Sequence, residues 1–151
     1  MHSIVFKDGK ELSEETLRKI VEIDNAVPSE FDPEWQPQEP EHQARLKQFQ
    51  ELSDRDFFEV AFSEKEIIGF HVILGKRGPK MNLGVISTLW VHPVYRGQGI
   101  AKQLKQKGLD WARASKLQYL QTSTHSNNER MMEINLKSGF VPYSVTLKYK
   151  L

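Results

Sequence analysis

The stretch VHPVYRGQGIAKQL, residues 91–104, decides how this chain folds. It follows an apolar run and holds two glycines and an arginine before a helical pattern begins. The first N–H groups of a helix have no partner within the helix, and Ser, Thr, Asp or Asn normally supplies the acceptor. No such residue stands at the start of this helix. The sequence therefore favours an anion from outside the chain in that role.

The two glycines of this stretch suit a phosphate site. Gly97 and Gly99 allow close approaches that a side chain would prevent, so that successive N–H groups converge on one point. The helix dipole adds roughly half a positive charge there, which favours a phosphate group. A simple tight turn is the alternative, and it is the commoner meaning of a lone G-x-G. Lys102 replaces the last glycine of the dinucleotide motif, but the order of strand, loop and basic helix favours a pyrophosphate site.

The composition indicates one ordinary globular domain, residues 1–151, with a core that needs neither disulfides nor metal. The chain has no cysteine, which excludes disulfides, thiolate metal sites and a cysteine nucleophile. It shows no apolar run as long as a signal peptide or membrane span, so we expect a cytoplasmic protein with no membrane partner. A net charge of +1 gives no support to nucleic-acid binding.

Charge is nevertheless distributed unevenly along the chain. Residues 11–43 hold ten acids against Arg18 and Lys19, and residues 96–116 hold six basic residues against Asp110. Solvated helix faces are the ordinary explanation of such blocks. The functional alternative is a cleft with one acidic and one basic side.

Hydrophobic periodicity predicts a mixed α/β (α+β) architecture. We expect helices over 13–27, 41–52, 98–115 and 128–138, strands over 57–62, 67–74, 85–91 and 117–123, and a final strand or hairpin over 140–151. Four prolines make residues 28–40 a loop. Antiparallel strands followed by a strand-helix-strand unit predict a mixed sheet with helices on both faces.

Two motifs in this order resemble the acetyl-CoA signature of the GNAT superfamily of N-acetyltransferases. The first, R/Q-x-x-G-x-G/A after a strand that ends V-x-P, is matched by Val91-His92-Pro93 and Arg96-Gly97-Gln98-Gly99-Ile100-Ala101. The second is matched by Asn128, Met131, Ile134, Asn135, Gly139 and Phe140 at the expected spacing. The resemblance covers about residues 57–140 strongly and the N-terminal helices loosely.

The resemblance implies a mostly antiparallel central sheet in which the strand 85–91 carries a bulge and splays from the strand 117–123. The pantetheine arm of acetyl-CoA, the cosubstrate, would enter that gap. The N–H groups of residues 96–101 would bind its pyrophosphate, and the Val91 N–H would bind the thioester carbonyl. The implied cofactor-binding residues are Leu89, Val91, Arg96, Gly97, Gln98, Gly99, Ile100, Ala101, Asn128 and Met131. Asn128 also fits a helix N-cap.

Acetyl transfer to an amine requires a neutral amine, a stabilised oxyanion and a proton for the departing thiolate. Many relatives have Glu or Asp where this chain has Ser87 and Thr88, and Tyr where it has Asn135. A carboxamide cannot replace a phenol as an acid. Asn135 therefore either hydrogen-bonds the sulfur or substrate, or is structural.

Other groups are candidates for the missing acid and base. These are His71, His125, Tyr143 and Glu59, each of which also has an ordinary structural or solvated explanation. We take Val91, Asn135 and His125 as the candidate catalytic residues. Proximity in a preorganised site can supply much of the rate.

The acceptor is expected to lie against the proline-rich loop. Phe31 and Trp35 are the candidate substrate residues, and acids beside these aromatic rings suit a cationic amine. A solvated loop is the alternative.

The leading interpretation is an acetyl-CoA-dependent N-acetyltransferase that acts on the primary amine of a small molecule, with no metal; a homodimer is compatible with the sequence. The alternatives are protein N-terminal or lysine acetylation, a non-catalytic acyl-CoA-binding module, and a nucleotide-binding domain.

Overall fold

The computed structural model describes residues 3–151, which contain a five-stranded sheet in the order β1-β2-β3-β4-β5. The strands are β1 Ile4–Asp8, β2 Phe57–Ser63, β3 Glu66–Arg77, β4 Asn82–Val91 and β5 Tyr119–Thr122. The first four pair antiparallel, and β5 pairs parallel with β4. The predicted mixed, mostly antiparallel sheet is confirmed.

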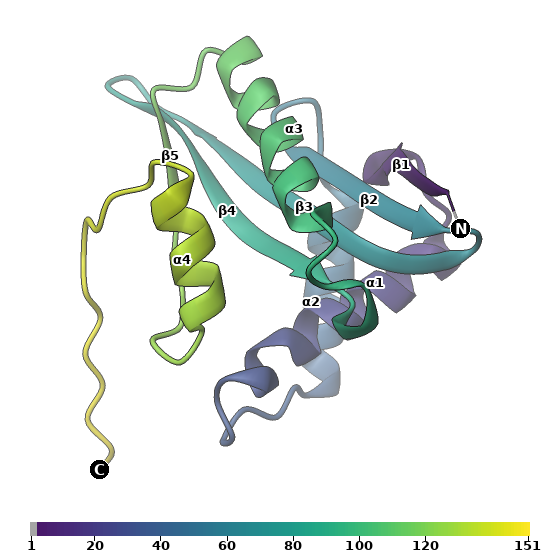
Figure 1. Cartoon of the computed structure of the whole chain (residues 1–151), viewed down its shortest axis with the longest axis horizontal. Coiled ribbons are helices and arrows are strands. Elements are labelled where there is room, and N and C mark those ends of the chain that lie inside the picture. The colour runs from purple at the N-terminus through teal and green to yellow at the C-terminus, as the bar shows by residue number, and fades with distance from the viewer. Residues whose placement is uncertain (1–2) are drawn as a thin grey trace.

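Helices cover both faces of this sheet, as predicted (Figure 1). They are α1 Glu14–Ala26, α2 Glu39–Gln50, α3 Ile100–Ala114 and α4 Glu129–Lys137, with short 3-10 helices η1 Gly9–Glu11, η2 Val27–Glu30 and η3 Pro93–Tyr95. One core joins α1 and α2 to the sheet through Ile20, Phe49 and Phe58. A second core joins α3 to the other face through Leu104 and Ile68.

The amphipathic pattern of α1 shows why it takes this position. Its buried residues are Leu17, Ile20, Val21 and Asp24, which recur at helical spacing. The Ser13 hydroxyl accepts a hydrogen bond from the Thr16 N–H at 3.3 Å and caps the helix. Asp24 is a charged residue on this otherwise apolar face of α1.

The strands β4 and β5 part halfway along their length. They pair only from Leu83↔Tyr119 to Ile86↔Thr122. The register between β3 and β4 shifts at the same place, because Val72 faces Thr88 while Ile73 faces Ile86, which leaves Ser87 as a bulge. The predicted splayed strand pair is thus present, and β4 has no β5 partner from residue 87 onward.

Two elements differ from the sequence prediction. β1 was not predicted, since its apolar residues Ile4, Val5 and Phe6 are consecutive and do not alternate. The predicted final strand over 140–151 does not form: residues 140–151 have no regular structure and no strand partner among residues 3–151. Within those same residues, no helix is both long enough and apolar enough to cross a bilayer.

Candidate functional site

A groove of about 310 Å³ opens where β4 leaves β5. It lies between the end of β4, the start of α3, the first half of α4 and the segment that follows α1. Its lining consists of Val27, Glu30, Phe31, Leu89, Trp90, Val91, Tyr95, Arg96, Gly97, Gly99, Ile100, Ala101, Lys102, Asn128, Arg130, Met131 and Ile134. The volume is at the lower end of the range for small-molecule sites.

The α3 N-terminus opens into this groove without a cap. Gly99 is the N-cap residue, with φ +82°, and no side chain among residues 3–151 caps this helix end with a hydrogen bond. Gly97 also has positive φ, at +79°, and a Cβ on either glycine would meet no heavy atom within 4 Å. The two glycines are therefore required by backbone conformation and not by crowding. The uncapped N–H groups and the helix dipole make this end of the groove a site for an anion.

Basic side chains surround the same end. Arg96 donates from Nε to the Val91 carbonyl at 2.8 Å and from Nη2 to both Glu30 carboxylate oxygens at 3.0 Å. Lys102 and Arg130 also line the groove. Burial lowers the pKa of Arg130, and the charge of Arg96 lowers it further, whereas Glu30 raises it. The charges of Arg96 and Arg130 are thus close enough to interact, which favours a ligand with more than one negative charge.

The α4 wall is apolar with one polar end. The Asn128 Oδ1 accepts a hydrogen bond from the Met131 N–H at 3.1 Å, so Asn128 is the N-cap of α4. Met131 and Ile134 follow it along the groove. Together with Leu89 and Val91 of β4, they form a channel suited to a slender chain of mixed polarity.

Ten of the residues predicted to bind the cofactor or the substrate lie in the groove. They are Phe31, Leu89, Val91, Arg96, Gly97, Gly99, Ile100, Ala101, Asn128 and Met131. Gln98 is exposed and does not line it. Trp35 is also outside the lining, where its Nε1 donates to the Asn25 carbonyl at 2.7 Å.

Two candidate catalytic residues lie outside the lining. His125 stacks against Phe31, with ring centroids 6.3 Å apart, and its Nδ1 accepts from the Asn127 N–H at 3.1 Å. Asn135 is only 5% exposed. Its Oδ1 accepts from Lys105 Nζ and its Nδ2 donates to Thr124 Oγ1.

The other proposed acids and bases lie outside the groove lining. His71 is buried, and burial lowers its pKa to about 4. Burial raises the pKa of Glu59, whose carboxylate lies 3.8 Å from Lys107 Nζ. Tyr143 is 87% exposed. None of the three lines the groove.

A buried carboxylate that the sequence interpretation missed contacts β4 beside its bulge. Asp24 accepts hydrogen bonds from the Thr88 hydroxyl and from Arg45 Nε, the latter at 2.7 Å. Arg45 Nη2 donates in turn to the Ser87 hydroxyl at 2.6 Å. Of the two positions at which the sequence lacks an acid, Asp24 therefore contacts Thr88 directly and Ser87 only through Arg45. The sequence did contain one sign of it, because Asp24 is a charged residue at a position of α1 where the helical pattern predicts burial.

Three acids of the proline-rich loop lie close to basic side chains. Glu30 pairs with Arg96, Asp32 lies 4.0 Å from Lys148 Nζ, and Glu34 lies 2.7 Å from Lys150 Nζ. These pairs leave little net negative charge for a cationic acceptor. Within residues 3–151, no cluster of His, Cys, Asp or Glu could hold a metal ion.

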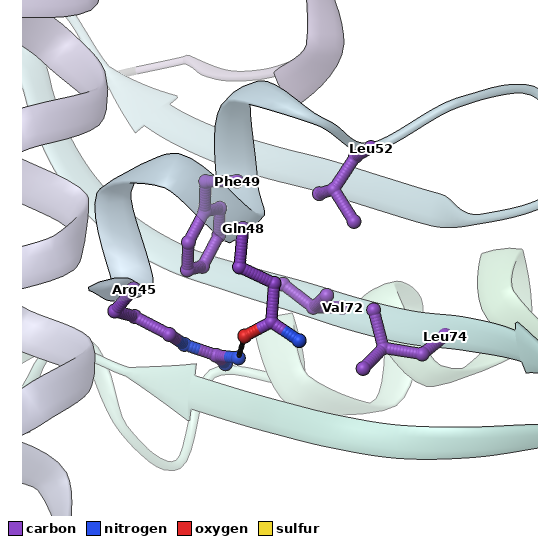
Figure 2. A pocket seen from close by; sticks show the side chains of 6 residues that line it. All are labelled: Arg45, Gln48, Phe49, Leu52, Val72 and Leu74. Carbon is purple, nitrogen blue, oxygen red and sulfur yellow. Dashed lines mark hydrogen bonds between the residues drawn. The ribbon is translucent and has the colours of Figure 1, made fainter. Parts of the chain in front are cut away.

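A second, shallower depression lies over α2 and β3 (Figure 2). Arg45, Gln48, Phe49, Leu52, Val72 and Leu74 line it. Its two polar side chains already bind each other, because Arg45 Nη1 donates to Gln48 Oε1. The groove at the splayed strands is therefore the better candidate for a ligand site.

Comparison with known proteins agrees with this geometry. The profile of the family described as "Acetyltransferase (GNAT) family" matches residues 20–140. Among curated protein sequences, none matches the chain.

Several solved structures share the fold. An acetyltransferase of Trypanosoma brucei has a TM-score of 0.71 and 17% identity, and the match covers 99% of this chain and 100% of that one. AAC(6')-Iy in complex with the bisubstrate analog CoA-S-monomethyl-acetylneamine has a TM-score of 0.69 and 15% identity, over 99% of this chain and 98% of that one. Glucosamine-6-phosphate N-acetyltransferase from Arabidopsis thaliana has a TM-score of 0.69 and 13% identity, over 98% of both chains.

Proposed function

This chain belongs to the acetyltransferase (GNAT) family, and from that premise we propose that it transfers acetyl from acetyl-CoA to the primary amine of a small molecule in the cytoplasm. The observation that carries the proposal is the continuous groove from the uncapped α3 N-terminus to the splayed end of β4. The AAC(6')-Iy neighbour holds a CoA bisubstrate analog, which supports CoA as the ligand type.

The groove has three parts that match the parts of acetyl-CoA. The pyrophosphate would lie at the N–H groups of residues 97–101, where Arg96, Lys102 and Arg130 add positive charge. The slender arm would run between β4 and α4, with Leu89 and Met131 on either side. The thioester would then lie near Val91, and a backbone N–H of β4 would bind its carbonyl oxygen.

In the proposed reaction, acceptor and acetyl-CoA are bound together. The amine lone pair attacks the thioester carbonyl, the C–S bond breaks, and the CoA thiolate leaves and takes up a proton. An alkyl ammonium with a pKa of ~10.4 must first lose a proton. We propose Asp24 as the group that accepts it: this carboxylate lies outside the groove lining, but it accepts a hydrogen bond from the Thr88 hydroxyl on β4, next to the lining residue Leu89.

Calorimetry with acetyl-CoA tests the proposal first, with ATP and NAD as control ligands. We expect micromolar binding that is selective for acetyl-CoA, followed by thiol release with members of a panel of small amines. Absence of acetyl-CoA binding would contradict both the transferase and any acyl-CoA-binding role. Longer acyl-CoA thioesters in the same titration would define the length of the acyl group.

A non-catalytic acyl-CoA-binding module is the second candidate. It is favoured by the replacement of the usual tyrosine by Asn135, and by the pairing of Glu30, the acid of the groove lining, with Arg96. Tight acetyl-CoA binding without thiol release across the amine panel would support it. Peptides with a free N-terminus or a lysine belong in that panel, because their turnover would instead indicate protein acetylation.

A further inference from the structure

The groove at the splayed strands has two halves, because consecutive side chains of β4 point to opposite faces of the sheet. Val91 belongs to the core under α3, whereas Trp90 belongs to the core under α1. These two helices lie on opposite faces of the sheet (Figure 1). The half on the α3 face holds the anion site and the channel that the proposed function gives to acetyl-CoA. The half on the α1 face is the space left for the acceptor amine.

This second half is apolar and largely aromatic. We call it the acceptor pocket, and its four lining residues are Val27, Glu30, Phe31 and Trp90. Val27 packs against the same core that contains Trp90. The Trp90 ring is 8% exposed and lies with its centroid 5.5 Å from that of Phe70. Packing from below therefore fixes the orientation of this ring, and its small exposed part faces the groove.

The backbone of Phe31 is held from two sides. Its N–H donates to the Pro28 carbonyl at 3.1 Å, within the segment that follows α1. Its carbonyl accepts from Asn127 Nδ2, also at 3.1 Å, in the loop before α4. The acceptor pocket thus has two aromatic rings whose positions are set before a ligand binds, which lowers the entropic cost of binding.

The one carboxylate among these four residues is already paired. Both oxygens of Glu30 accept from Arg96 Nη2 at 3.0 Å. A second guanidinium is also near, because Glu30 raises the pKa of Arg130 while Arg96 lowers it. The negative charge of Glu30 is therefore balanced without an ammonium group from the acceptor. A second cationic group on the acceptor would find no free counter-charge among the residues that line this pocket.

The proposed proton acceptor lies on the same face as the acceptor pocket. Thr88 precedes Trp90 by two residues on β4, so both side chains point toward α1, and the Thr88 hydroxyl donates to Asp24. Val27 follows Asp24 by three residues at the end of α1, which places both on one side of that helix. An amine that points toward Thr88 therefore brings the rest of its molecule against the apolar lining.

We infer that the acceptor is a primary monoamine whose body is a single aromatic ring, bound against Trp90 and Phe31 with Val27 beside it. The inference rests on the proposed function, since it concerns the amine of the same reaction. Contacts between aromatic rings stabilise a complex beyond the apolar area that they bury, which favours a flat ring over a saturated one. The whole groove measures about 310 Å³, so the ring has few substituents.

Matched pairs of amines test the class of acceptor, with thiol release from acetyl-CoA as the readout. Hexylamine and hexamethylenediamine share one carbon chain and differ by an ammonium group, whereas phenethylamine and cyclohexylethylamine differ in the flatness of the ring. We expect kcat/KM to be at least tenfold higher for hexylamine than for the diamine. It should be at least threefold higher for phenethylamine than for cyclohexylethylamine. A diamine as good as hexylamine, or no preference for the flat ring, would overturn the inference.

Binding to the protein saturated with CoA separates this inference from the proposed reaction. No acetyl group is then present, so calorimetry measures recognition of the amine alone. Phenethylamine should bind with a Kd below about 1 mM, and hexamethylenediamine at least tenfold more weakly. This result in a protein that transfers no acetyl group would support the pocket and contradict the transferase. Transfer to other amines without binding of phenethylamine would overturn the inference and leave the transferase intact.

Variants of the partly buried Phe31 locate the ring contact. Phe31→Leu keeps an apolar side chain and should abolish the preference for phenethylamine over cyclohexylethylamine. Phe31→Glu adds a carboxylate and should raise kcat/KM for the diamine relative to hexylamine at least threefold. Tyr119→Leu is the matched control, because its ring is 62% exposed on β5 and lies outside the groove lining.

The control variant should keep both wild-type selectivity ratios. Circular dichroism and the Kd for acetyl-CoA, within about threefold of wild type, show that the Phe31 variants keep their fold and their CoA site. Unchanged ratios in both folded Phe31 variants would overturn the inference.

Discussion

Arg96 and Glu30 join the two sides of the groove: one guanidinium nitrogen lies 3.0 Å from both oxygens of the carboxylate. Arg96 belongs to the loop before α3, and Glu30 ends η2 after α1. The Nε of the same arginine donates to the last carbonyl of β4, on Val91. A single side chain thus positions the anion-binding loop relative to both the proposed acetyl site and the proposed acceptor side.

The Arg96–Glu30 ion pair predicts that substitutions of its two members affect acetyl-CoA binding differently. Arg96→Met removes positive charge from the proposed phosphate site and should weaken acetyl-CoA binding by about 10- to 100-fold, or ~1.4 to 2.7 kcal/mol. Glu30→Gln keeps the guanidinium and should leave the dissociation constant within about threefold of wild type, because it only loosens η2. Calorimetry measures both. Equal weakening by both variants would mean that Arg96 acts by holding η2 and not on the ligand.

The conformation of Gly99 predicts a loss of acetyl-CoA affinity when a side chain is added. Gly99→Val places a β-branched residue at φ +82°, at a backbone cost of about 1–2 kcal/mol, and its side chain enters the anion site. Gly139→Val is the matched control, since Gly139 has φ +96°, also with open space, at the end of α4. Both variants should lower Tm, whereas only Gly99→Val should weaken binding at least tenfold. Unchanged affinity in folded Gly99→Val would contradict the loop assignment.

The anion-binding loop could be predicted from the sequence because the groups that form it are adjacent in the chain. A strand, two glycines and a helix without a cap predict converging N–H groups, and the structure has Gly97 and Gly99 at positive φ with no side-chain cap. Asn128 was likewise predictable as a cap of α4, since capping depends on residues only three apart.

Groups that meet through the tertiary fold were not predictable. Asp24 contacts Thr88 across 64 residues, and Lys105 contacts Asn135 across 30. No local pattern fixes such pairs, because α1 reaches β4 only through the packing of a whole sheet face. Residues 140–151 have the alternating sequence of a strand, but they pair with no strand among residues 3–151, because the local pattern does not determine whether a strand meets its partner.

Asn135 is expected to stabilise the fold and not to take part in the chemistry. It is the hydrogen-bond acceptor for the buried Lys105, whose pKa burial lowers to about 8. Asn135→Ala should therefore cost about 1–3 kcal/mol of unfolding free energy, while kcat stays within about threefold. Asn135→Asp, which restores an acceptor, should recover part of the stability. A hundredfold loss of kcat in folded Asn135→Ala would contradict this and assign the amide a role in catalysis.

Asp24 is expected to accept the amine proton. Asp24→Asn should lower kcat at least about 100-fold near neutral pH, and the deficit should shrink as pH approaches the ~10.4 of a free amine, which then loses its proton unaided. Arg45→Met is the control: it disturbs the same network but keeps the carboxylate. A deficit that is equal at all pH values, or equal in both variants, would make Asp24 structural.

The burial of the His71 imidazole predicts that the folded protein loses stability in acid. Its Nδ1 donates to the Thr88 carbonyl, which is 2.9 Å away, so Nε2 is unprotonated; this atom is buried without a partner among the described residues. Burial lowers the pKa of the folded protein's imidazole from 6.5 to about 4, so below pH 6.5 the unfolded chain binds a proton that the folded chain does not. Stability is complete above the unfolded pKa and falls between pH 6.5 and 4, by up to about 3 kcal/mol.

Urea unfolding across this pH range measures the effect. His71→Gln should be less stable than wild type at pH 7.5 and should lose less on acidification, so that the two curves converge toward pH 4. His125→Gln changes an exposed histidine and should keep the wild-type slope. Parallel curves for wild type and His71→Gln would show that the imidazole already binds its proton in the folded protein, which a buried Nε2 without an acceptor does not allow.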